Sequence, residues 1–280
     1  MNKQWVNSFL SKFVKPRWQI GFLLTPLENL VSGSNQSFVW IKNPYHDGWF
    51  ADPFVLDVTD QFIELLVEDF RFKDSKGRIS KIVIDKQTLK VIRRNVLLEG
   101  GHYSFPAILR NKEKVYVYPE QSRQSRLDLF EYDATTNTLN KIQTLSNQAL
   151  SDAVIFDNCL YATIGTDDGE NDRVLRTWPL FLPFDNNKVF VKQVFRFNEC
   201  IARNGGDFFK INQNIYRPAQ ECNRWYGNAV SIQQFINDNF IEVKRLKGIH
   251  TLNNYLGVSV VDRKFFPFRW LYWILGFTDK

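Results

Sequence analysis

Acidic residues open several short apolar runs along the chain, and they are the first candidates for chemistry. Asp52, Asp152 and Asp207 each stand directly before such a run, and His250 holds the same place in a weaker copy. Two carboxyl groups in one site can act on a glycosidic bond, because one protonates the leaving oxygen while the other activates water or attacks the sugar carbon. Crowded like charges would raise the pKa of one group and keep it protonated near neutral pH. The alternative is that each Asp only caps a turn.

These runs recur with a regular period, which predicts the fold. Their markers are separated by 53, 47, 55 and 43 residues, and they are Asp52, Phe105, Asp152, Asp207 and His250. A blade of four short strands takes about 40–50 residues. The sequence therefore predicts an all-β fold, a five-bladed β-propeller. A β-sandwich or two stacked sheets is the alternative.

The fifth copy is short of strands, whereas two strand-like runs, 18–24 and 37–41, precede the first copy. We therefore expect N-terminal strands to complete the last blade, which removes an exposed sheet edge. The composition agrees with an all-β chain, since 25 Phe, 8 Trp and 10 Tyr accompany a single Met. We expect a basic amphipathic segment over 1–16, the propeller over 17–264 and an aromatic tail over 265–280.

In a propeller the innermost strands line a central channel, so the residues that open them meet at one mouth. We expect Asp52 and Asp152 to be catalytic there, together with Glu120 at the end of a second strand. The residues expected to bind substrate at or near the mouth are Trp49, Glu68, His102, Tyr103, Ser104, Asp207, Arg217, Gln220, Tyr226 and His250.

Four of these binding residues have specific expected roles. Trp49 offers a flat apolar face to a sugar ring, although core packing is its alternative role. Arg217 can grip phosphate or carboxylate with two parallel hydrogen bonds, or it packs over Trp225. Gln220 and Tyr226 can hydrogen-bond sugar hydroxyls.

Metals, cofactors and nucleic acids are not expected. The three cysteines are widely spaced and form no C-x-x-C pair, so neither a zinc site nor a disulfide framework is indicated. The three histidines match no ligand spacing. The net charge is +6, but Lys and Arg are scattered, which does not favour nucleic acid. A basic balance does suit an anionic membrane surface or a phosphorylated ligand.

A series of segments resembles a known family. WFADPF, HYSFPAIL, YPEQS, LSDAVIF, GGDFF and YRPAQECNRWYG occur in that order between about residues 36 and 260. They resemble the N-terminal domain of glucosamine inositolphosphorylceramide transferases, a family similar in fold to five-bladed arabinanases, xylosidases and invertases.

The resemblance implies roles for three acids. Asp52 matches the first-blade Asp that serves such glycosidases as base or nucleophile. We expect Glu120 to be the proton donor, and in the mechanism that we expect, Asp152 adjusts the pKa values of both. The glycosidases usually take the acid from a later blade, whereas Glu120 ends a strand of the second. The second copy also departs from the pattern, because it opens with 104–106, Ser-Phe-Pro, and has no Asp.

Both chain ends have features of membrane contact. The segment 265–277 is strongly aromatic but too short to span a bilayer, and basic residues lie in and just before it, at Arg263, Lys264 and Arg269. Near the N-terminus, aromatic residues spaced four apart indicate an amphipathic helix. The alternative is that both ends pack on the propeller or form a subunit contact.

No apolar secretion signal and no run of about 18 apolar residues is present. We therefore expect a cytoplasmic protein, peripheral to the inner face of the membrane. The predicted function is action on glycosidic bonds, by transfer or hydrolysis, in the synthesis of cell-surface polysaccharide or glycolipid. Its partner would be a nucleotide-linked or lipid-linked sugar, or a glycan. The alternatives are a non-catalytic glycan- or partner-binding module and a membrane-surface scaffold in a polysaccharide assembly complex.

Overall fold

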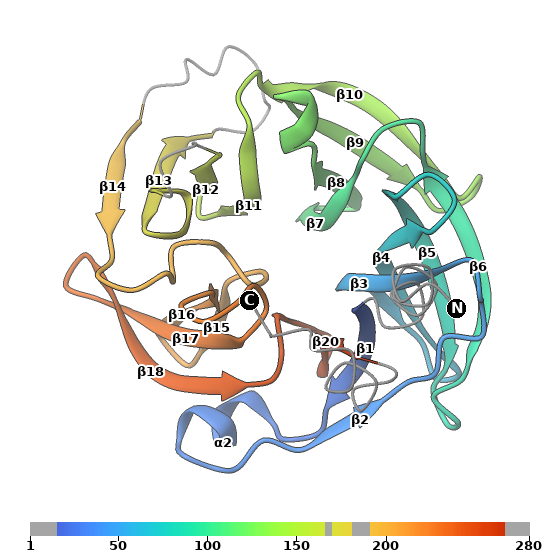
Figure 1. Cartoon of the computed structure of the whole chain (residues 1–280), viewed down its shortest axis with the longest axis horizontal. Helices are drawn as coiled ribbons and strands as arrows, with labels where there is room; N and C mark the ends of the chain where they lie inside the picture. Colours follow the sequence, from blue (N-terminus) through green and yellow to red (C-terminus); the bar gives the residue numbers. More distant parts are fainter. Residues whose placement is uncertain (1–15, 166–169, 181–190, 267–280) are drawn as a thin grey trace, which may run out of the picture.

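The structure, a computed structural model, describes residues 16–165, 170–180 and 191–266. Within these residues, five four-stranded antiparallel sheets are arranged around a central axis (Figure 1). The predicted five-bladed β-propeller is therefore confirmed.

The first four blades follow one another along the chain. The first contains β3 (Gly48–Val58), β4 (Phe62–Arg71), β5 (Lys76–Asp85) and β6 (Val91–Leu98). The second contains β7 (Ser104–Asn111), β8 (Lys114–Glu120), β9 (Leu127–Asp133) and β10 (Thr138–Ser146), with the short 3-10 helix η1 (Ser122–Gln124) between β8 and β9. The third contains β11 (Leu150–Phe156), β12 (Cys159–Ile164), β13 (Val174–Pro179) and β14 (Gln193–Arg196), with η2 (Glu170–Asp172) before β13. The fourth contains β15 (Phe209–Ile211), β16 (Asn214–Glu221), β17 (Ala229–Ile236) and β18 (Asn239–Lys247).

The fifth blade joins the two ends of the chain. It contains β19 (Thr251–Tyr255), β20 (Val258–Phe265), β1 (Arg17–Leu23) and β2 (Phe38–Trp40), and the helix α2 (Leu27–Val31) lies between the last two. β1 pairs with β20 along its whole length, from Arg17 opposite Phe265 to Leu23 opposite Ser259. The expectation that N-terminal strands complete the last blade is confirmed, and this pairing closes the ring.

The strand pattern follows from burial and turn chemistry. β4 is covered by a blade on each side, so Leu65, Leu66 and Val67 are all buried. β18 is an outer strand and is instead mostly exposed, with Leu246 as its one buried residue. The turns 157–158 and 237–238 hold Asn and Asp at positive φ between 47° and 58°, which is the two-residue hairpin geometry that these residues favour.

The core lies between neighbouring blades. One cluster joins the first three blades around Phe54, Phe105 and Val154. A second joins the fifth and first blades, and a third joins the fourth and fifth. The packing therefore fixes the angle between blades and holds their inner strands toward the axis.

The predicted amphipathic segment over 1–16 and the tail over 265–280 fall almost wholly outside the described residues, so their structure and their membrane contact stay predictions. The described strands begin at Arg17 and end at Phe265. Among the described residues, no helix has the length and apolar character needed to cross a membrane.

Candidate functional site

A β-bulge recurs at the start of the innermost strand in three blades. Asp52, Phe105 and Asp152 have φ values of 48°, 43° and 47°, and the strand register shifts at each of them. Residues other than glycine rarely adopt this left-handed backbone conformation. A bulge changes the direction of the side chains beside it. Three of the five sequence markers therefore occupy one repeated structural position.

Hydrogen bonds between blades hold these bulges in place. The N–H of Asp52 donates to Asp262 Oδ2 at 2.9 Å. The N–H of Phe105 donates to Asp52 Oδ2 at 3.1 Å. The N–H of Asp152 donates to Glu120 Oε2 at 2.8 Å. Each carboxylate thus joins its own blade to the next, and Asp262 is a member that the sequence analysis missed.

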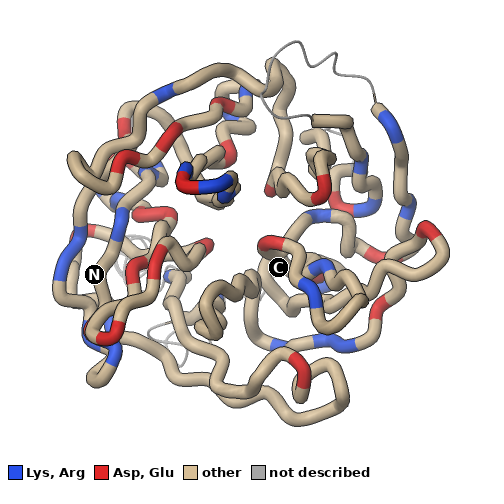
Figure 2. The backbone as a smooth tube through the Cα atoms, turned by 180° about the vertical axis from the view of Figure 1, so that it is seen from behind, with Lys and Arg blue, Asp and Glu red and all other residues tan. Residues whose placement is uncertain are grey.

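The bulges surround a cavity of about 310 Å³ at the mouth of the propeller. Figure 2 shows acidic positions at the inner edges of several blades, around the middle of the ring. The residues that line the cavity are Trp18, Trp49, Ala51, Asp52, Glu68, Phe70, His102, Ser104, Glu120, Ser122, Arg123, Asp152, Arg203, Tyr226 and His250. All three predicted catalytic residues are among them.

His250 lies between two carboxylates at one side of the cavity. Its Nδ1 is 3.4 Å from Asp52 Oδ1 and 3.4 Å from Asp262 Oδ2. Burial disfavours the imidazolium, but the charges of Asp262 and Asp52 outweigh burial and raise the pKa of His250 to about 10. Burial also raises the pKa of Asp52, against the pull of His250. The Oδ1 of Asp52 is closed off from solvent, so this carboxylate faces the protein more than the cavity.

Asp52, His250 and Asp262 also have the donor types of a metal site. One donor atom from each lies within 4.8 Å of the others. A metal there would have to displace the proton of His250, because an imidazolium has no lone pair and the raised pKa of His250 favours that form. The three residues form an ion-pair cluster in which Asp52 Oδ1 has no hydrogen-bond partner among the described residues, and the absence of a metal stays a prediction.

Glu68 is the acid whose carboxyl group the fold leaves free. It is 7% exposed, and its carboxyl has no hydrogen-bond partner among the described residues. Burial raises the pKa of Glu68 well above its ordinary value, and the charges of Asp52 and Glu120 raise it further. Gly77 lies beside it, where a Cβ atom would collide with Glu68 Oε1. A carboxyl group whose raised pKa favours the protonated form, and which no described residue hydrogen-bonds, therefore borders the cavity.

Glu120 and Asp152 are more firmly held. Glu120 Oε1 accepts from Ser122 Oγ at 2.6 Å, and its Oε2 accepts from the N–H of Asp152. Asp152 Oδ2 accepts from Arg203 Nε at 2.6 Å, while its Oδ1 has no hydrogen-bond partner among the described residues. Burial raises the pKa of Asp152 to about 6 although Arg203 opposes it. Asp152 thus keeps one free oxygen and titrates just below neutral pH.

His102 adds a hydrogen-bond donor to the cavity wall, on the side of Gly77 and Glu68. His102 Nδ1 accepts from the N–H of Gly77 at 2.9 Å. Burial, Arg123 and Lys76 lower the pKa of His102 to about 4, so the ring is neutral and its proton lies on Nε2. Arg123, which the sequence analysis missed, lines the cavity from η1.

Aromatic rings form another part of the wall. Trp49 stacks on Phe70 with centroids 4.4 Å apart and an interplanar angle of 1°. Trp18 lies 6.3 Å from Trp49, 5.8 Å from Tyr226 and 4.5 Å from His250, measured between centroids. One face of Trp49 thus packs on Phe70, its contact with a sugar stays a prediction, and β1 supplies a second tryptophan to this wall.

Four of the predicted binding residues do not line the cavity, and Arg217 differs most from expectation. Its side chain is fully buried, where Nε donates to Asn204 Oδ1 and Nη1 to Gln233 Oε1, both at 2.7 Å. Nη1 and Nη2 also donate to the carbonyls of Ile201 and Ala202. The fold uses this guanidinium, so it has no donor to offer a ligand in the cavity.

The other three lie behind or below the wall. Gln220 faces His250, with its Oε1 3.1 Å from Nε2, and it donates to Asn204 O at 2.9 Å. Tyr103 donates its backbone N–H to Gly77 O. Asp207 donates its backbone N–H to Asn253 Oδ1 at 2.7 Å, and burial raises its pKa to about 7. These residues support the site from outside it.

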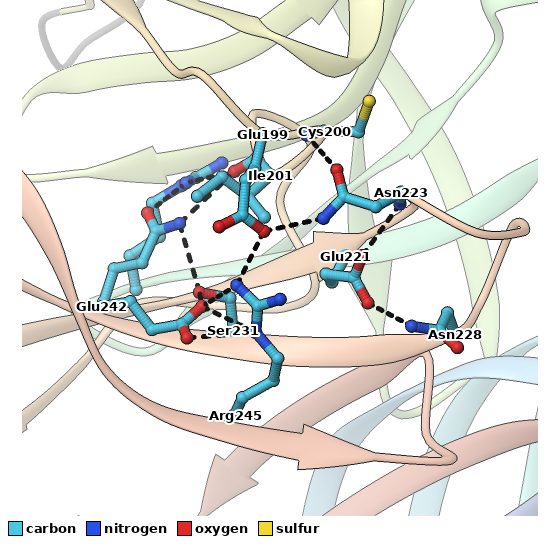
Figure 3. A network of polar contacts seen from close by, with 11 residues as sticks. Glu199, Cys200, Ile201, Glu221, Asn223, Asn228, Ser231, Glu242 and Arg245 are labelled. Atoms are coloured by element: carbon cyan, nitrogen blue, oxygen red, sulfur yellow. Dashed lines mark hydrogen bonds and ion pairs between the residues drawn. The ribbon is translucent and has the colours of Figure 1, made fainter.

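A polar network holds the linker that carries Arg203 (Figure 3). Glu199 Oε2 accepts from Asn223 Nδ2 at 2.7 Å and from Arg245 Nη2 at 2.9 Å. The N–H of Cys200 donates to Asn223 Oδ1 at 2.9 Å, and the N–H of Asn223 donates to Glu221 Oε1 at 2.8 Å. The network therefore fixes the linker before Arg203 against the turn 222–228, which carries Tyr226.

Comparisons with known proteins agree with this architecture. The family model described as glucosamine inositolphosphorylceramide transferase 1, N-terminal, matches residues 25–254. The transferase of that name from Oryza sativa subsp. japonica is 27% identical over 267 residues, which cover 83% of this chain and 35% of that protein. The Arabidopsis thaliana protein is 26% identical, over 78% of this chain and 32% of its own length. The chain thus spans about a third of these relatives.

Solved structures that resemble the chain are glycosidases. An exo-β-1,3-galactanase from Phanerochaete chrysosporium has a TM-score of 0.53 at 11% identity, covering 76% of this chain and 60% of its own. A β-xylosidase/α-arabinofuranosidase from a compost metagenome has a TM-score of 0.53 at 11% identity, covering 78% and 90%. At such low identity the likeness concerns the fold alone.

Proposed function

The chain belongs to the family of glucosamine inositolphosphorylceramide transferase 1 N-terminal domains, and from this family and the cavity we propose that the propeller acts on a glycosidic bond at its mouth. The ligand we propose is a nucleotide-linked or lipid-linked sugar, or a glycan. The observation that carries the proposal is Glu68, a buried residue at the cavity whose carboxyl group has a raised pKa and no hydrogen-bond partner among the described residues. Pairs of acids whose environments give them different protonation states mark acid and base roles.

The proposed roles differ from those that the sequence indicated. Glu68 donates its proton to the leaving oxygen as the bond to the sugar carbon breaks. Asp152 accepts a proton from the attacking water or acceptor hydroxyl through its free oxygen, and its pKa of about 6 suits a base near neutral pH. Glu120 is a poorer proton donor than Glu68, because both of its oxygens already accept hydrogen bonds.

Asp52 has a supporting role in this proposal. One of its oxygens accepts from Phe105 and the other faces His250, out of contact with solvent. Its charge is one of the two neighbouring charges that most raise the pKa of Glu68. We therefore expect Asp52 to keep the proton on Glu68, while the Trp49 and Phe70 rings hold the sugar.

The test begins with ligand binding, measured by thermal shift against nucleotide sugars, sugar phosphates and oligosaccharides. A ligand at a hundred times its Kd stabilises the folded state by about 2.7 kcal/mol. Glu68→Gln should bind the same ligand but turn it over about 10²–10⁴ times more slowly. Asp152→Asn should do the same. Asp60→Asn, in the exposed β3–β4 turn, is the matched control. Full turnover by Glu68→Gln would rule out the proposed acid.

A second candidate function is binding without turnover. It is favoured by the way in which Asp52, Glu120 and Asp152 each help to hold the blades or Arg203 in place. Under this reading the wild type and Glu68→Gln bind a sugar with similar Kd, and neither releases product over long incubation.

A further inference from the structure

Both ends of the described chain leave the propeller at the rim of the cavity. Phe265 ends β20 and Arg17 begins β1, and the two residues are paired. β20 and β1 are the second and third strands of the fifth blade. In every other blade these two strands are joined by a connection. The second-blade connection, 121–126, supplies Ser122 and Arg123 to the cavity wall. The fifth blade therefore has two chain ends where another blade has a loop that borders the site.

Exposed aromatic side chains lie on the two blades beside these ends. Phe72 in the first blade is 41% exposed, and Trp225 and Tyr226 in the fourth are 45% and 41% exposed. They lie in the equivalent turns, 72–75 and 222–228, at the same face. The other large hydrophobic residues that are comparably exposed in the described part of the chain are aliphatic. Aromatic side chains gathered on one face are typical of a membrane interface rather than of scattered surface residues.

The same turns are basic. Lys73 and Arg224 are exposed in these turns, Lys76 is exposed at the start of β5, and Arg123 is exposed on η1. The acid between the two lysines, Asp74, is paired with Arg71. The sequence of the chain ends has the same composition, since the part beyond Phe265 is aromatic with two further basic residues, and residues 1–15 combine three lysines with tryptophan and phenylalanine. Basic and aromatic residues together match the head-group region of an anionic bilayer.

We propose that the mouth face docks on a membrane that carries anionic lipids, so that the cavity opens toward the head groups. The surface is formed by the exposed residues Phe72, Lys73, Lys76, Arg224 and Trp225, on either side of the chain ends. Docking in this orientation places the mouth within reach of a head group that projects from the bilayer. The inference concerns the partner of this face and does not require that the site be catalytic.

Co-sedimentation of the full chain with vesicles tests the proposal. Vesicles of phosphatidylcholine alone are compared with vesicles that also contain phosphatidylserine. The wild type should partition to the anionic vesicles, and this partition should fall with salt. Lys73→Glu/Lys76→Glu/Arg224→Glu should lower it by well over tenfold, because each cation near an anionic surface contributes roughly fivefold. Phe72→Ser/Trp225→Ser should lower it on both vesicle types.

The matched control is Ile92→Ser/Ile241→Ser, which removes two apolar side chains of similar exposure, 53% and 49%, from the outer strands β6 and β18. It should partition like the wild type. Thermal unfolding of every variant checks that the fold is kept. The proposal is overturned if the wild type stays in the supernatant with anionic vesicles, or if control and mouth variants lose partition equally. It is also overturned if the mouth substitutions change only the oligomeric state.

Discussion

Two buried polar clusters of this propeller differ in what the fold does with their hydrogen-bonding groups. In the fourth blade, Arg217 is fully buried and its guanidinium donates to Asn204, Gln233 and two backbone carbonyls. At the mouth, Glu68 is nearly as buried, and no described residue hydrogen-bonds its carboxyl group. The Glu68 carboxyl group borders the cavity, so a ligand there can hydrogen-bond to a group that no described residue uses.

The two clusters are nevertheless connected. Asn204, which accepts from Arg217, donates through Nδ2 to the carbonyl of Asp152 at 2.7 Å. Asn204 directly follows Arg203, whose Nε holds the Asp152 carboxylate. The Arg217 cluster, whose hydrogen bonds are made within the protein, thus positions one wall of the cavity. Glu68, which no described residue hydrogen-bonds, faces that cavity. We therefore predict that substitutions in the Arg217 cluster mainly lower the stability of the fold. Substitutions at the mouth should mainly change ligand binding and turnover.

The largest effect on stability is expected for Arg217→Ala. The substitution removes several charge-assisted hydrogen bonds and leaves Asn204 and Gln233 with buried unpaired groups, so the free energy of unfolding should fall by about 3–5 kcal/mol. Urea denaturation measures it. Arg224→Ala, at an exposed turn, is the control and should change stability by no more than about 0.5 kcal/mol. A loss below about 1 kcal/mol for Arg217→Ala would remove the distinction between the clusters.

Glu68→Gln should instead raise the free energy of unfolding. The folded state raises the pKa of Glu68, so it holds a proton that the unfolded chain has already released. The wild type therefore loses stability as pH rises from the ordinary glutamate pKa through the raised one, and the non-titrating Gln does not. We expect the variant to be more stable by about 1–2 kcal/mol at pH 8, the usual scale of a trade between function and stability.

The pH dependence distinguishes this explanation from simple packing. The advantage of Glu68→Gln should shrink as pH falls toward 4, where both states of the wild type are protonated. Urea denaturation at several pH values measures the trend. An advantage that stays constant with pH would show that Glu68 is not the group that retains the proton.

The sequence was sufficient for the fold because the repeat has a physical cause. Asp52, Phe105 and Asp152 recur at blade spacing since each begins an innermost strand with the same bulge. The closing blade was also predictable, because the last repeat lacked strands that the N-terminus could supply. The propeller topology alone then placed the residues that open the innermost strands together at one mouth.

The roles within the site were less predictable, because they depend on partners from distant segments. Whether an acid is free or held is decided by groups such as Asp262 for Asp52 and Arg203 for Asp152, and no local pattern pairs them. Arg217 lies in a conspicuous motif, but the direction of its side chain depends on strand register, which the sequence does not reveal. Trp18 was placed in a strand, yet only the closure of the ring brings it to the cavity.

The smallest of the predicted effects concerns Asn223 and tests whether the network of Figure 3 positions the site or only stabilises the fold. Asn223→Ala removes the hydrogen bonds to Glu199 and Cys200, both exposed, so stability should fall by only about 0.5–1 kcal/mol. Ligand affinity should also fall, by about fivefold, because the linker before Arg203 and the turn with Tyr226 lose the hydrogen bonds that join them. Asn239→Ala, which removes an exposed local hydrogen bond in the β17–β18 turn, is the control.

If calorimetry gives both variants the wild-type Kd for a ligand found in the screen, the network is structural only. If Asn223→Ala alone binds weakly, Arg203 belongs to both regions of the comparison. The network around Asn223 then positions Arg203, and the charge of Arg203 acts on the ligand at the mouth.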